Sequence, residues 1–199
     1  MTWQSFQATA SANNTTASIL ELNAVTAGQS PVQTMAIEGV TAPNEMRFSG
    51  SATSTGYLSR SNDGSLLTFT GANSTNTTAN VNTLNPRAVG TFDATGTYSL
   101  KTTYTGGSGN QTRAATSLDN SAWFIADQGG LYTNGATTAS PVGNFRNIHS
   151  FGGTVYGSSA STTVIAVGTF SAITGGTYRL AGPDESCRRA GLLHGLVRQ

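Results

Sequence analysis

The chain contains little cysteine, little charge and no long apolar segment. Its single cysteine, Cys187, excludes a disulfide framework within the chain. Charged residues make up 10% of the sequence and the net charge is +1, so no basic surface is expected to attract nucleic acid or an anionic membrane. No apolar run reaches the roughly 18 residues that a membrane-spanning helix needs. We therefore expect neither a nucleic-acid partner nor a membrane span.

The sequence also lacks the short motifs that define common catalytic and cofactor sites. It has no Gly-x-Ser-x-Gly elbow, no phosphate-binding loop, no dinucleotide fingerprint and no zinc-ligand spacing. The glycine-rich stretch 106–109 follows an expected strand but precedes no helix, so it does not predict a phosphate cradle. We expect no cofactor and no metal, and no motif assigns a catalytic residue.

Serine, threonine and glycine are abundant, and apolar residues occur in short runs separated by turn residues. This composition favours short strands over long helices and predicts an all-β chain. Residues 17–23 and 32–37 predict a first hairpin, and 46–50 predict a third strand. Residues 1–16 are polar and unpatterned, so they predict a disordered or irregular N-terminal segment.

Three stretches share one pattern, in which a strand, a tight turn and an apolar strand follow one another. The turns are 62–64, 118–121 and 152–153, and strands are also expected at 88–92, 98–104, 163–170 and 175–180. Asp63 and Asp119 occupy turn positions, where aspartate is favoured for backbone reasons. A recurring antiparallel meander predicts a β-propeller-like fold of about four blades over residues 17–182. A β-sandwich or jelly roll is the alternative.

The three blocks are SATSTGYLSRSNDGSLLTFTG, TRAATSLDNSAWFIADQGGLY and FRNIHSFGGTVYGSSAS. With them the chain resembles a family of mostly uncharacterised bacterial proteins that are exported β-propellers. The resemblance implies a secreted, periplasmic or cell-surface location, although the N-terminus lacks the features of a signal peptide. It implies no reaction and no catalytic residues.

A closed ring of six or seven blades needs roughly 240 to 350 residues, so the resemblance suggests an incomplete ring. Open blade edges expose apolar surface that tends to pair, so a homo-oligomer is expected. Residues 183–199 change abruptly in composition. They predict either a C-terminal helix or sequence that is not native to the protein, and we favour the second interpretation.

Alignment of the three blocks on their turns places several basic and aromatic residues at matching positions. Arginines from neighbouring strands could hold a carboxylate or sulfate, and an aromatic ring could stack on a sugar. Arginine at a strand start also commonly pairs with a neighbouring strand. The ligand-binding candidates are Tyr57, Arg60, Arg113, Arg146 and His149.

Two classes of function remain open. The first is an exported binding or scaffold propeller that recognises a glycan, an anionic group or a protein at its blade-loop face. The second is a hydrolase or lyase acting on a polysaccharide or ester, with acidic residues such as Glu38 and Glu45, or His149, as acid and base. An enzyme should bring at least two titratable groups together in a pocket.

Overall fold

The computed structural model describes residues 2–160, 163–168 and 176–179, with side chains from residue 4 to residue 160. The described residues contain strands, one short 3-10 helix at Val81–Thr83 and no α-helix. The predicted tail at 183–199 and the outer residues of the last two predicted strands lie outside the described residues. The prediction of an all-β chain is confirmed.

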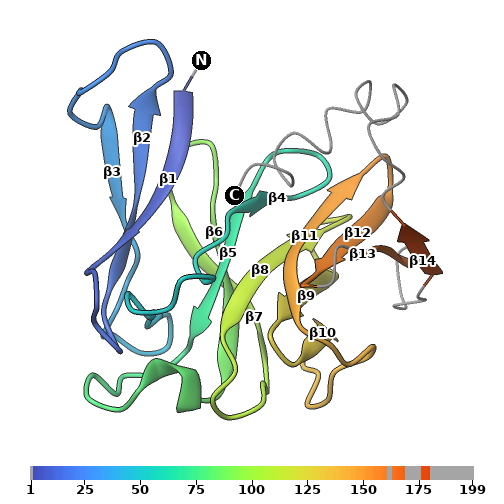
Figure 1. Ribbon diagram of the computed structural model, residues 1–199. Helices are drawn as coiled ribbons and strands as arrows, with labels where there is room; N and C mark the ends of the chain where they lie inside the picture. The colour runs from blue at the N-terminus through green and yellow to red at the C-terminus, as the bar shows by residue number, and fades with distance from the viewer. Residues whose placement is uncertain (1, 161–162, 169–175, 180–199) are drawn as a thin grey trace.

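Fourteen strands are described and form four antiparallel sheets that follow one another along the chain (Figure 1). The first sheet contains β1 (Thr2–Ala8), β2 (Ala17–Asn23) and β3 (Gln33–Ala36). The second contains β4 (Ser59–Arg60), β5 (Leu67–Ala72), β6 (Arg87–Phe92) and β7 (Tyr98–Tyr104). The third contains β8 (Thr112–Ser117), β9 (Trp123–Asp127) and β10 (Gly130–Thr133). The fourth contains β11 (Phe145–Phe151), β12 (Thr154–Ser159), β13 (Thr163–Gly168) and β14 (Gly176–Arg179).

Every hydrogen-bonded strand pair within these sheets joins neighbours in sequence, so each sheet is a simple meander. Short turns explain this connectivity, because antiparallel strands can be joined by a few residues whereas parallel strands need a long crossover. The sheets stand side by side in chain order from the blue to the orange part of Figure 1. None of the four sheets closes on itself.

The N-terminal segment differs from its prediction. Residues 2–8 form β1, which pairs with β2 from Thr2↔Asn23 to Ala8↔Ala17. The segment is too polar for its sequence to predict a strand. Its strand conformation depends on backbone hydrogen bonds to β2. Phe6 then packs edge-on against Phe48 with ring centroids 5.1 Å apart.

The strand predicted at 46–50 is reduced to two isolated bridges. Arg47 pairs with Ala72 of β5, whereas Phe48 pairs with Thr15 beside the first sheet. Met46 and Phe48 are buried. This segment therefore bridges the first and second sheets instead of extending either one.

The hydrophobic core is divided among the spaces between successive sheets. All five residues of strand β9 are buried, because neighbouring sheets cover both of its faces. Trp123 and Ile125 belong to a cluster that includes Val89 and Tyr104 of the second sheet. Their neighbour Phe124 belongs to a cluster that extends into the fourth sheet. Because alternate residues of a strand point to opposite faces, the third sheet is covered on both sides.

Threonine hydroxyls connect the second and third sheets at buried positions. Thr68 donates to the carbonyl oxygen of Ala115, and Thr116 donates to that of Arg60 at 2.7 Å. These bonds satisfy polar groups that would otherwise be costly to bury. The high threonine content therefore contributes to contacts between sheets as well as to strand formation.

The three predicted turns lie at one end of the molecule and are joined to one another. Asp63 accepts from the backbone N–H of Ser65 at 3.0 Å, as expected for an aspartate that stabilises a turn. Asn120, which has a φ of 64°, donates to the Asp63 carboxylate at 2.8 Å. The N–H of Gly153 donates to the side chain of Asn62 at 3.1 Å. Strands β4, β8 and β11, which precede these turns, therefore end close to one another.

Candidate functional site

The five predicted site residues fall into two groups instead of one. Arg60 and His149 line a common hollow. Arg113 of β8 and Arg146 of β11 both donate hydrogen bonds to Ser54, which does not line this hollow. Tyr57 lies close enough to influence the pKa of Arg113 and belongs to this second group.

The first strands of the last three sheets bring these residues together. Strand β8 packs against β4 and β11, and β4 also contacts β11. The hydroxyl groups of Thr116 and Ser150 lie 2.7 Å apart in this packing. The Ser59 hydroxyl forms a second contact of this kind with Nδ1 of His149. Small side chains allow the strands to approach closely, and their hydroxyl groups hydrogen-bond to one another. The strand starts and their side chains are thereby held in a fixed relation.

A hollow of about 320 Å³ opens where these strands meet the first sheet. Residues from β1, β4, β5 and β11 and their flanks line it. They are Gln4, Leu58, Ser59, Arg60, Leu67, His149, Ser150 and Phe151. The hollow combines one cationic group, neutral hydrogen-bonding groups and apolar side chains, a combination typical of small-ligand sites.

Arg60 is the cationic group of this hollow. Its Nη2 donates to Oε1 of Gln4 at 3.2 Å, and its side chain makes no other hydrogen bond to residues 4–160. No carboxylate within this described part forms an ion pair with it. Since a guanidinium carries several donors in a planar fork, Arg60 retains donors for an anionic ligand.

His149 supplies the imidazole of the hollow. Its Nδ1 lies 2.9 Å from the hydroxyl oxygen of the buried Ser59, and its ring lies 5.8 Å from that of the exposed Phe151. Burial lowers the pKa of His149 to about 4. The imidazole is therefore neutral near pH 7, where it can hydrogen-bond a ligand without adding charge.

The second group lies around Ser54. Arg113 is 1% exposed and donates to the carbonyl oxygen of Ser54. The half-buried Arg146 donates to the hydroxyl oxygen of the same residue at 2.8 Å. Tyr57 is half-buried and packs against the cluster of the third and fourth sheets.

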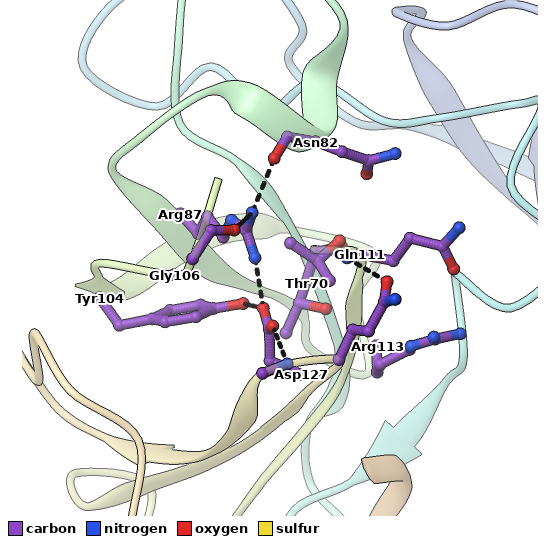
Figure 2. A network of polar contacts seen from close by, with 12 residues as sticks. Thr70, Asn82, Arg87, Tyr104, Gly106, Gln111, Arg113 and Asp127 are labelled. Atoms are coloured by element: carbon purple, nitrogen blue, oxygen red, sulfur yellow. Dashed lines mark hydrogen bonds and ion pairs between the residues drawn. The ribbon is translucent and has the colours of Figure 1, made fainter. Parts of the chain in front are cut away.

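The sequence did not reveal a buried charged network between the second and third sheets (Figure 2). Arg87 donates from Nη1 to the carboxylate of Asp127 at 2.6 Å, and both side chains are fully buried. Tyr104 donates to the same carboxylate oxygen at 2.8 Å. Burial and the Asp127 charge raise the pKa of Tyr104 well above its ordinary value, so its hydroxyl keeps its proton.

Two carbonyl oxygens complete the coordination of Arg87. Its Nη2 donates at 2.8 Å to both Asn82 and Gly107. The network fastens the loops around 82 and 107 to β9, so we assign it a structural role. Arg87 and Asp127 stand 40 positions apart, and no local spacing could have paired them.

Glu38 and Glu45 do not form a site with His149. Glu38 accepts from the N–H groups of Val40 and Thr41 at 2.8 and 2.9 Å, which lowers its pKa. Glu45 is buried, and its Oε2 has no hydrogen-bond partner within residues 4–160. Neither glutamate lines the hollow. Neither glutamate therefore shares a site with His149.

A search of the described residues finds no cluster of histidine, cysteine and acidic side chains suited to holding a metal ion. Among the same residues, no helix has the length and apolar character needed to cross a membrane. Comparison of the chain with family models, with curated proteins and with solved structures yields no match.

Proposed function

We propose that this chain is a binding protein built from propeller-like blades, exported by a bacterium, with a ligand site where the first strands converge. Four successive meanders and the mutual contacts of β4, β8 and β11 support the blade arrangement. Propeller blades stand around a central channel, and we expect β4, β8 and β11 to be the strands that face it. The four sheets would then form part of a ring.

The observation that carries the proposal is the hollow that holds both Arg60 and His149. Arg60 offers charge-assisted hydrogen bonds to a carboxylate, and the neutral His149 offers a further polar contact. The exposed ring of Phe151 and the side chain of Leu67 provide apolar surface beside them. An acidic sugar combines these requirements, because it has one carboxylate, several hydroxyl groups and an apolar ring face.

Calorimetric titration with glucuronic and galacturonic acid oligosaccharides, and with their neutral counterparts, tests this proposal. The wild type should bind an acidic ligand, and Arg60→Gln should weaken binding about tenfold or more because a charge-assisted hydrogen bond is lost. Lys101→Gln is the matched control, since it removes the same charge from an exposed position on β7. Equal affinity for acidic and neutral sugars, or equal losses in the two variants, would contradict the proposal.

A second candidate function is ester hydrolysis, favoured by the 2.9 Å contact between the Ser59 hydroxyl and His149 in the hollow. Ser59 would be the nucleophile and His149 the base. The lowered pKa of His149, about 4, makes it a weak base and places this function second. Covalent labelling by a fluorophosphonate that disappears in Ser59→Ala would support hydrolysis, and absence of labelling would exclude this pair as the catalytic group.

The blade arrangement also carries the proposal of a homo-oligomer. Two copies could pair through the outer faces of their first and last sheets, as apolar sheet faces tend to do. Mass measurement in solution tests this point. A stable monomer at micromolar concentration would contradict it.

A further inference from the structure

Arg113 and Arg146 form a paired cationic feature outside the hollow. Both guanidiniums donate to Ser54, one to its carbonyl and the other to its hydroxyl. Nη2 of Arg113 also lies 3.4 Å from the side-chain oxygen of Asn144. These are the only hydrogen bonds from the two guanidiniums to residues 4–160, and every acceptor is neutral.

No carboxylate neutralises this pair within residues 4–160. The ion pair found there joins Arg87 to Asp127, and Asp127 is already engaged by Tyr104 as well. Figure 2 shows the guanidinium of Arg113 turned away from Asp127. Neither guanidinium therefore has a carboxylate at ion-pair distance within residues 4–160, and Asp127 raises the pKa of Arg113 only from beyond that distance.

Burial makes this arrangement costly. Arg113 is 1% exposed, and its Nε is buried without a hydrogen-bond partner. Burial, followed by the charge of Arg146, lowers the pKa of Arg113 to about 10, so the side chain is still charged at pH 7. An uncompensated buried charge and an unsatisfied donor each destabilise a folded protein.

An anion would remove both costs. Sulfate and phosphate present several oxygen acceptors to the fork of donors on each guanidinium. Because Arg113 is buried and Arg146 is half-buried, the position suits a small free ion and not a large ligand. The half-buried Asn144, whose side-chain oxygen accepts from Arg113, could add a neutral hydrogen-bonding group.

We propose that Arg113 and Arg146 form a binding site for a small inorganic oxyanion, sulfate or phosphate, at Ser54. This site is separate from the hollow of Arg60 and His149 and uses none of its lining residues. The bound ion would neutralise the two guanidiniums and fasten the segment around Ser54 to β8 and β11.

Thermal unfolding and calorimetric titration with sodium sulfate test the proposal, with sodium chloride at the same ionic strength as the reference. Sulfate at millimolar concentration should raise the unfolding temperature of the wild type. Arg146→Gln should weaken sulfate binding about tenfold or more, and it should fold because Arg146 is only half-buried. Lys101→Gln, which removes the same charge from an exposed position on β7, is the matched control and should respond to sulfate as the wild type does.

The test is independent of the proposed function, because Arg146 does not line the hollow. Loss of the sulfate effect in Arg146→Gln but not in Lys101→Gln supports the Ser54 site, whether or not acidic sugars bind in the hollow. The same sulfate effect in all three proteins would indicate general exclusion of the salt from protein surface and would overturn the proposal. Absence of any sulfate effect on the wild type would also overturn it.

Discussion

Arg87 and Arg113 are the two arginines less than 2% exposed among residues 4–160, and their surroundings differ. Arg87 is 0% exposed and bonds to the carboxylate of Asp127 and to two carbonyl oxygens. Arg113 is 1% exposed, bonds to neutral oxygen atoms and has Arg146 beside it. Both lie near strand starts, so position along a strand does not separate them. The difference between them is an ion-paired carboxylate, which Arg87 has and Arg113 lacks within residues 4–160.

The strongest test of this comparison replaces each arginine with methionine. Arg87→Met leaves the Asp127 carboxylate buried without its partner and should lower the free energy of unfolding by about 3 to 5 kcal/mol. Arg113→Met removes a charge that has no ion-paired carboxylate within residues 4–160 and should change it by no more than about 1 kcal/mol. Urea unfolding of both variants measures the difference. Similar losses would show that Arg113 is as structural as Arg87.

A methyl group at Gly106 tests how tightly the Arg87 network is packed. A Cβ at this position would overlap the Arg87 guanidinium, with Cζ 2.6 Å away. Three hydrogen bonds hold that guanidinium in place, so it cannot move freely. Gly106→Ala should therefore destabilise the protein by about 1 to 3 kcal/mol.

The matched control for this change is Gly107→Ala. Its Cβ would meet the side-chain amide of Asn110, which is the end of a flexible side chain. We expect a smaller loss of stability, measured by the same urea unfolding. An equal loss in the two variants would show that the loop backbone, and not contact with Arg87, determines the effect.

His149 extends the comparison to a half-buried group that is neutral near pH 7. Its pKa of about 4 lies below the ordinary value near 6.5. Between these two pH values, the unfolded chain takes up a proton that the folded chain excludes, so stability falls as the pH is lowered from 6.5 to 4. This group should account for about 1 to 2 kcal/mol of that fall, since it is partly solvated.

His149→Gln removes this contribution while keeping a polar side chain. The free energy of unfolding of the variant should fall less steeply than that of the wild type between pH 6.5 and 4. Carboxylates titrate in the same range, but subtraction of the two curves removes their common effect. Parallel curves would show that His149 has an ordinary pKa in the folded protein.

Local sequence was sufficient for most of the secondary structure. The hairpin of β2 and β3, the strands of the second, third and fourth sheets and the turns at Asp63 and Asp119 follow from alternation and turn chemistry. These features depend on residues a few positions apart, and a single sequence displays such spacing directly. Strand β1 and the bridging role of Met46 and Phe48 were missed because their partners lie in other parts of the chain.

The sequence by itself therefore determined an all-β chain of meanders and identified the basic residues of the candidate sites. Only the tertiary structure divided those residues, placing Arg60 with His149 and Arg113 with Arg146. It alone also paired Arg87 with Asp127. The physical reason is that the role of a buried charge depends on the residue that faces it across a sheet interface. The packing of the sheets determines that neighbour, and spacing along the chain does not.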